Sequence, residues 1–300
     1  MTSVASLLRE DPAKAPAAIE RSPGYWTGVA KRVSRDKVAM LAGILILALV
    51  LVAIFAPWIA PADPYAGRTI RRLRPIGTAG FPLGTDELGR DMLSRLIHGA
   101  RYSLMMGVTP VIMAFIAGSL IGIVAGYAGG RANTLMMRTI DVFYAFPSVL
   151  LAVALSGALG AGIQNALVSL TIVFIPPIAR VAEAVTTQVR SRDYVEAARA
   201  SGARALTIIR VHVLGNVLGP IFVYATGLIS VSMILASGLS FLGLGVRPPE
   251  PEWGLMLNTL RTAIYTQPMV AALPGVMIFL TSISFNLLAD GLRSAMDVKQ

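Results

Sequence analysis

Long stretches without a charged residue most constrain what this chain can fold into. Five of them divide the sequence: residues 38–62, 102–130, 142–179, 211–246 and 262–289. A helix crosses the ~30 Å hydrocarbon core of a bilayer with about 20 mostly apolar residues, so each stretch is long enough to span a membrane. Because lipid cannot satisfy backbone polar groups, helices are expected rather than open sheets. The stretches predict an all-α membrane protein.

The third stretch is too long for a single crossing. As one helix its 38 residues would reach about 57 Å, roughly twice the hydrocarbon thickness. Small and polar residues interrupt it midway: Gly157, Gly160, Gly162, Gln164 and Asn165. We therefore predict a helical hairpin here and about six transmembrane helices in all. The first, residues 38–62, is expected to be a retained anchor, because its apolar run is longer than that of a signal peptide.

Composition agrees with a membrane protein. Hydrophobic residues make up 55% of the chain, charged residues 14%, and the mean hydropathy is +0.69. Soluble domains carry roughly a quarter charged residues. The net charge of +10 does not indicate nucleic-acid binding, because the basic residues are scattered between apolar runs. We expect contacts with membrane lipid and none with nucleic acid.

Arginine and lysine placement predicts the orientation. With a cytoplasmic N-terminus, the inside segments carry 17 basic residues and the outside segments 9, which the positive-inside rule favours. The basic run at residues 68–74 argues the other way. We expect both termini to be cytoplasmic. The predicted parts are a leader (1–37), the anchor helix (38–62), an extracytoplasmic loop (63–101), a core transmembrane domain (102–290) and a tail (291–300).

A polar connection at residues 180–216 is the strongest functional candidate. Residues 192–201 favour a helix, with Asp193 and Glu196 early and Arg199 late, as suits the helix dipole. Gly202 permits a sharp change of direction or a close approach to another chain. A short helix at residues 206–213 can follow. A helix–glycine–helix on the membrane surface offers a surface to a soluble partner.

Here the sequence resembles a known family. Glu196-Ala197-Ala198, followed by Gly202 and by residues 212–216, is similar to the EAA loop of bacterial ABC importer permeases. The resemblance implies a type I importer permease fold in which this loop is a cytoplasmic coupling helix seated on an ATPase subunit. The implied coupling residues are Asp193, Tyr194, Glu196, Ala197, Ala198, Gly202 and Ala203. Gly215 stands where the family usually has proline.

Two further segments narrow the resemblance. Residues 83–91, continuing to Leu104, resemble the segment before the second span in C-type permeases of the dipeptide/oligopeptide/nickel family. Residues 237–254 resemble the same subfamily's loop between spans five and six. The resemblance implies a bacterial inner-membrane protein whose partners are a homologous B-type permease, two ATPase subunits or domains and a soluble or lipid-anchored binding protein. The transported solute would be a di- or oligopeptide or a related solute.

The chain has no energy source of its own. None of its four lysines lies in the Gly-Lys-Ser/Thr of a P-loop. We therefore expect no cofactor in this chain, with ATP and Mg²⁺ bound by the partner ATPases, and no enzymatic activity of the permease itself. The alternative, an ion-coupled secondary transporter, predicts ionisable residues at membrane depth, which the charge-free stretches lack. A membrane-embedded enzyme would need a polar cluster that two distant histidines do not provide.

Two further features predict helix packing and the order of the N-terminal segment. Gly118, Gly122 and Gly126 form a small-residue stripe, which argues for close helix packing within the subunit or across a dimer. Residues 1–34 contain three prolines and no sustained apolar face, and we expect them to be poorly ordered in isolation.

Overall fold

The computed structural model describes residues 25–296, and this part of the chain is mostly helical, without a strand. Five helical segments are long and apolar enough to cross a membrane: α2 (Lys37–Ile54), α4 (Met92–Ala128), α7 (Ile163–Arg190), α10 (Leu214–Phe241) together with the turns that precede it, and α12 (Pro268–Met296). A sixth is made of two helices, α5 (Gly130–Tyr144) and α6 (Ser148–Leu159), bent by 84°. The prediction of about six transmembrane helices is confirmed.

The first arm of the third span, helix α5, differs from the prediction. Its helix begins at Gly130 rather than near residue 142, and it breaks before Pro147, whose ring nitrogen has no hydrogen to donate. The charge of Asp141 is tolerated within this arm because its carboxylate pairs with Arg180 of α7. The hairpin turn lies where the sequence placed it. There the Asn165 side chain donates to the backbone oxygens of Leu159 (2.8 Å) and Gly160 (3.0 Å).

The glycine stripe of α4 packs inside the subunit, against α7. A Cβ atom added to Gly118 would lie 2.9 Å from the backbone oxygen of Ile175, and one at Gly126 would lie 2.8 Å from that of Glu183. At Gly122 the added atom would collide with the backbone of Ala179. Close approach of the two helix backbones therefore requires these glycines, which settles the choice between packing within the subunit and packing across a dimer.

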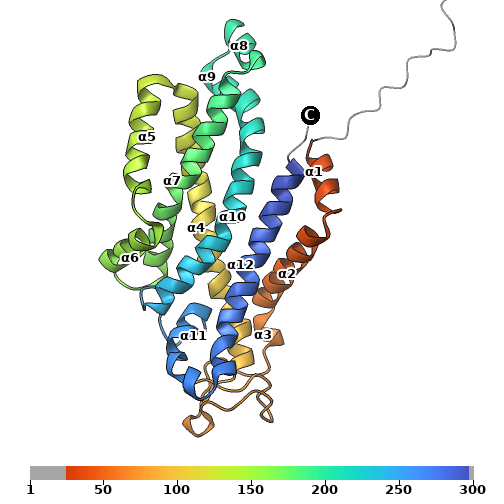
Figure 1. Ribbon diagram of the computed structural model, residues 1–300, viewed down its shortest axis with the longest axis vertical. Coiled ribbons are helices and arrows are strands. Elements are labelled where there is room, and N and C mark those ends of the chain that lie inside the picture. Colours follow the sequence, from red (N-terminus) through yellow and green to blue (C-terminus); the bar gives the residue numbers. More distant parts are fainter. Residues whose placement is uncertain (1–24, 297–300) are drawn as a thin grey trace, which may run out of the picture.

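The short elements gather at the two ends of the bundle (Figure 1). One end carries α1 (Tyr25–Val33), the C-terminal end of α12, α8 (Asp193–Ala200) and α9 (Ala205–Ile208). The opposite end carries α3 (Ala56–Ile59), η2 (Thr69–Arg71), α11 (Trp253–Thr259) and η4 (Arg261–Tyr265), with the long connection between α3 and α4. An even number of spans places the two described ends of the chain on the same side.

The leader is more structured than the sequence predicted. Residues 25–33 form α1, which packs against α12 and buries Val29. The rest of the segment expected to lack order, residues 1–24, lies outside the described residues. Asp36 then caps α2 by accepting hydrogen bonds from the backbone nitrogens of Val38 (2.9 Å) and Ala39 (3.1 Å).

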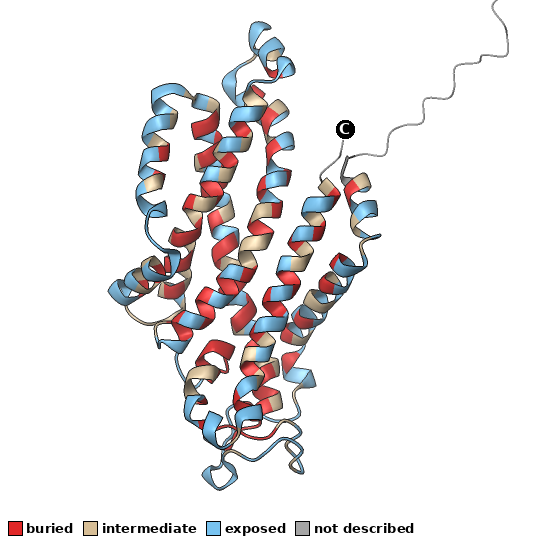
Figure 2. Ribbon diagram, viewed as in Figure 1, coloured by how far each residue is buried: buried red, intermediate tan, exposed pale blue. Residues whose placement is uncertain are grey.

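Buried residues lie mainly on the helix faces that point toward the centre of the bundle (Figure 2). The helices α4, α7 and α10 turn buried faces toward one another, whereas α5 and α6 are largely exposed. The largest core cluster joins these central helices, with Leu170, Phe174, Ile178 and Ile221 almost fully buried. A second core joins α2, α4, α11 and α12 around Met92 and Trp253.

Candidate coupling loop

The polar connection forms the tip of one end of the molecule. Helix α7 runs out to Arg190, α8 follows after Ser191 and Arg192, and α9 leads through the π-helical turn η3 (Ile209–Val213) into α10. Figure 1 shows α8 and α9 projecting beyond the ends of the neighbouring long helices. The predicted helix–glycine–helix is therefore present and lies at the extremity of the bundle.

Apolar side chains anchor this tip to the bundle. Val195 of α8 is fully buried, as are Ile208 of α9 and Val213 of η3, and all three belong to the central core cluster. The ring of Tyr194 lies 6.3 Å from that of His212, centroid to centroid. The coupling residues predicted from the sequence did not include Val195. Its position within the Tyr194–Glu196 segment, apolar between polar neighbours, is the signal that would have identified it.

Gly202 ends α8 through its backbone conformation. Its φ is +80°, in the left-handed region that favours glycine. Its backbone nitrogen donates to the oxygen of Arg199 (3.0 Å), and that of Ala203 donates to the oxygen of Ala198 (3.1 Å). These two bonds form a Schellman motif, accompanied by half-burial of Ala198 and Ala203 against the core. An added Cβ at Gly202 would meet no atom within 4 Å, so the side of Gly202 facing away from the bundle is open.

The outward face of the tip is polar with apolar residues around it. Of the predicted coupling residues, the structure leaves exposed Asp193, Tyr194, Glu196, Ala197 and Gly202. Within the described residues, the Glu196 carboxylate forms no hydrogen bond or ion pair with another side chain. Leu206 (76% exposed) and Val211 (63% exposed) add apolar surface beside α8 that the prediction did not include.

At the opposite end, the motif of residues 83–91 is folded into a buried ionic cluster. The Asp86 carboxylate contacts the guanidinium groups of Arg90 (2.6 Å) and Arg95 (3.2 Å), and all three side chains are almost fully buried. Arg95 also donates to the backbone oxygens of Pro64 (3.0 Å) and Pro249 (3.4 Å). Because both oxygens belong to connections between spans, the cluster ties two loops to the start of α4.

Glu252 anchors the second resembling segment. Its carboxylate caps α11, accepting from the backbone nitrogens of Gly254 (2.9 Å) and Leu255 (2.8 Å), and it accepts from Ser103 of α4 (3.2 Å). Burial raises the pKa of Glu252, and the hydrogen bonds that it accepts oppose that shift. The neighbouring Trp253 donates its indole N–H to the oxygen of Leu96 (3.0 Å).

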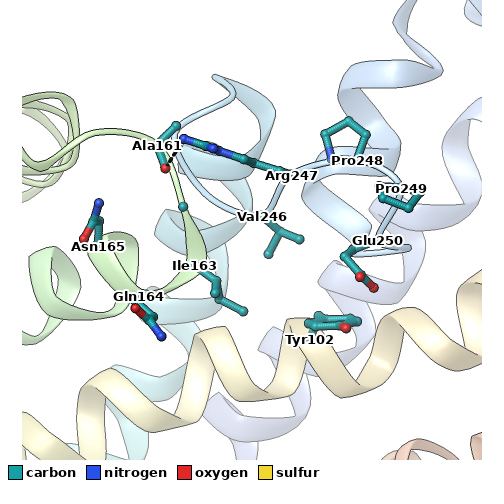
Figure 3. Close-up of a pocket in the computed structure, with 11 residues that line it drawn as sticks. Tyr102, Ala161, Ile163, Gln164, Asn165, Val246, Arg247, Pro248, Pro249 and Glu250 are labelled. Atoms are coloured by element: carbon teal, nitrogen blue, oxygen red, sulfur yellow. Dashed lines mark hydrogen bonds between the residues drawn. The ribbon is translucent and has the colours of Figure 1, made fainter.

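A cavity of about 540 Å³ opens at this end between the α6–α7 turn and the α10–α11 connection (Figure 3). Arg247 bridges the two loops by donating to the oxygen of Ala161 (2.5 Å). Glu250 faces Tyr102 across the other side of the cavity and accepts from the Tyr65 hydroxyl (2.7 Å). Partial burial and this hydrogen bond raise the pKa of Tyr65. The cavity is therefore lined by polar side chains such as Arg247 and Glu250 together with apolar ones such as Ile163 and Val246.

Comparison with known protein families gives matches that include segments from both ends of the bundle. Residues 118–299 match the family described as binding-protein-dependent transport system inner membrane component, and residues 24–75 match the N-terminal transmembrane domain of oligopeptide transport permease C. The first match contains the α8–Gly202–α9 loop. The chain belongs to this family. It is an all-α, multi-pass permease, and the comparisons lend no support to the ion-coupled alternative.

Relatives that align with nearly the whole chain support the same family assignment. The permease is 43% identical over 299 residues to the di/tripeptide transport system permease protein DppC of Pseudomonas aeruginosa (strain UCBPP-PA14), covering 97% of each chain. It is 42% identical over 274 residues to the glutathione transport system permease protein GsiD of Escherichia coli O157:H7, covering 91% of this chain and 90% of that one. The predicted resemblance to C-type permeases of the peptide family is confirmed.

The fold matches solved importers. A chain from an inward-facing crystal form of the MetNI methionine ABC transporter superposes with a TM-score of 0.56 at 20% identity, covering 68% of the permease and 97% of that chain. A second crystal form gives a TM-score of 0.54 at 19% identity. At this level of identity the likeness shows the fold, which is that of an ABC importer permease.

Proposed function

We propose that this permease carries short peptides, glutathione-like tripeptides included, into the cell as half of a heterodimeric pathway driven by separate ATPase subunits. The observation that carries the proposal is the exposed α8–Gly202–α9 tip, anchored by Val195 and open around Gly202. A rigidly based helix at the extremity of the bundle is suited to transmit force between a soluble partner and the spans. The names of the relatives supply the solute class.

In this proposal the tip, the leader (1–37) and the tail (291–300) face the cytoplasm, and the 63–101 loop faces outward. The excess of basic residues on the tip's side supports this orientation. The cavity of Figure 3 then lies on the outer face, where a substrate-binding protein would deliver its cargo. Residues 102–290 form the transport core, with 38–62 as its anchor.

The coupling surface consists of Asp193, Tyr194, Glu196, Ala197, Ala198, Gly202 and Ala203. Exposed members contact the ATPase, while Ala198 and Ala203 hold the Schellman turn that presents them. Nucleotide and Mg²⁺ are bound by the ATPases alone, because the permease lacks the Gly-Lys-Ser/Thr of a P-loop. The ATPases' nucleotide state then biases the permease between inward- and outward-facing forms.

Reconstitution tests the proposal. The permease is placed in proteoliposomes with its partner permease, the ATPases and the binding protein, and uptake of labelled dipeptide, tripeptide and glutathione is measured with and without ATP. We expect uptake that requires both ATP and binding protein, and no nucleotide binding or hydrolysis by the isolated permease. Uptake driven by a proton or sodium gradient without ATP would contradict the proposal.

A further inference from the structure

The bend in the third span lies at the middle of the membrane. The cavity beside it, of about 390 Å³, is lined from α7 by Val173, Phe174 and Pro177 and from α10 by Tyr224, Leu228 and Val231. Both groups are central in helices that run from residue 163 to 190 and from 214 to 241. The bend is therefore at mid-depth, far from either membrane surface.

Backbone groups at this bend have no partner in the described chain. The helix ladder is interrupted between α5 and α6, and α6 has no side-chain cap. The N–H groups left without an acceptor are those of Ser148, Val149 and Leu150. The oxygens left without a donor are those of Tyr144, Ala145 and Phe146.

The opposite wall of the same cavity adds further polar groups. Pro177 cannot donate within α7, so the oxygen of Val173, which lines the cavity, loses its helical partner. Tyr144 and Tyr224 also line the cavity, and neither phenol hydroxyl has a hydrogen-bond partner among residues 25–296.

Lipid cannot cover such a surface. Irregular backbone at membrane depth is tolerated where it is buried in protein or lines a water-filled space, because hydrocarbon offers no hydrogen bonds. Yet Phe143, Tyr144 and Phe146, here called the aromatic break, are exposed to 42%, 57% and 56%. The open cavity between them and α7 leaves room for water, and its unpaired donors and acceptors match the amide groups of a peptide.

We propose that the aromatic break lines the water-filled translocation pathway and contacts the passing solute. The aromatic faces pack against its apolar side chains, while the free N–H and C=O groups of the bend exchange hydrogen bonds with its amides. A mid-membrane surface of this kind favours peptide-like solutes over equally small polar solutes without apolar side chains. The inference rests on the proposed peptide transport for its solute, and on the bend's own geometry for its contact with water.

The absence of cysteine from the chain makes the test direct. Tyr144→Cys and Phe146→Cys are each placed in the full reconstituted complex and treated with a charged, membrane-impermeant thiosulfonate reagent. The matched control is Leu47→Cys in α2, because Leu47 is 57% exposed on a helix with an unbroken hydrogen-bond ladder. Modification of this chain is followed by mass, with and without ATP, together with peptide uptake.

We expect both break cysteines to react at least tenfold faster than Leu47→Cys in at least one nucleotide state, and modification to lower uptake at least tenfold. Reaction less than tenfold faster in both states would overturn the inference, placing the break against lipid or the partner permease. Fast reaction with unchanged uptake would overturn contact with the solute. Because labelling needs no transport, loss of ATP-driven uptake in the unmodified complex would instead count against the proposed function.

Discussion

Substitutions at Gly202 distinguish most clearly between a structural role and a coupling role of the tip. The φ of +80° at Gly202 is strained for other residues, and the left-handed conformation costs an alanine about 1–2 kcal/mol. No atom lies within 4 Å of an added Cβ, so Gly202→Ala meets no collision within the chain, and Gly202→Trp carries the same backbone strain with a much larger side chain. The two variants therefore share the backbone strain and differ in side-chain volume on the open side of the tip.

A strain of about 1 kcal/mol changes the population of the folded turn about fivefold. We expect Gly202→Ala to lower peptide uptake and ATPase association about fivefold, in line with the smaller population of the folded turn. Gly202→Asn should have a smaller effect, because asparagine tolerates the left-handed region. Gly202→Trp should abolish uptake and ATPase capture while its abundance in the membrane stays close to that of the alanine variant.

The assay combines three measurements on each variant: abundance in the membrane, recovery of the ATPase subunits on pull-down, and peptide uptake. Glu196→Ala is measured alongside, and we expect it to weaken ATPase association without affecting abundance, because its carboxylate is exposed and unpaired in the described chain. Equal uptake by the alanine and tryptophan variants would refute close approach of a partner at Gly202. Loss of all variants from the membrane would assign the tip a folding role alone.

Three further predictions concern stability, each measured by thermal unfolding of the purified complex. Gly122→Leu should prevent close packing of α4 on α7 and greatly reduce folded protein, whereas Gly238→Ala, with open space around it, should be neutral or stabilising by up to about 1 kcal/mol. Asp86→Ala leaves buried guanidinium groups unpaired and should cost about 3–5 kcal/mol, whereas Asp290→Ala, whose pair is exposed, should cost less than about 1 kcal/mol. Because burial raises the pKa of Glu252, wild-type stability should fall as pH rises from the ordinary glutamate pKa toward that raised pKa, and Glu252→Gln should flatten this dependence. Equal effects of Gly122→Leu and Gly238→Ala would contradict the close packing of α4 on α7, and equal effects of Asp86→Ala and Asp290→Ala would contradict burial of the Asp86 ion pairs. A pH profile that is unchanged in Glu252→Gln would contradict the raised pKa of Glu252.

The spans and the tip could be predicted from sequence because their causes are local. Charge-free length decides whether a helix can cross a bilayer, and the α8 helix follows from its acidic start and glycine end. The glycine stripe was recognisable, but its partner was not, since a stripe does not say which backbone approaches it. Only the structure shows that Gly122 meets Ala179 of the same chain.

The bend and the ionic cluster were missed for a different reason. Asp141 interrupts the charge-free run, so the third span was placed too late in the sequence, and its pairing with Arg180 depends on how α5 packs on α7. Pro147 was the available signal for a break, because proline cannot continue the helix ladder. Burial of Asp86 with Arg90 and Arg95 joins segments that composition alone places in an exposed loop.

A photo-crosslink at Ala197 tests the central claim most directly. Ala197 is exposed on α8, so benzoylphenylalanine in its place should leave the bundle intact and reach any partner seated on the tip. Irradiation of the assembled complex in membranes should give an adduct between this chain and an ATPase subunit. An adduct with the substrate-binding protein would place α8 on the opposite side of the membrane. Either that adduct, or none with the ATPase in a transport-competent complex, would contradict coupling through α8.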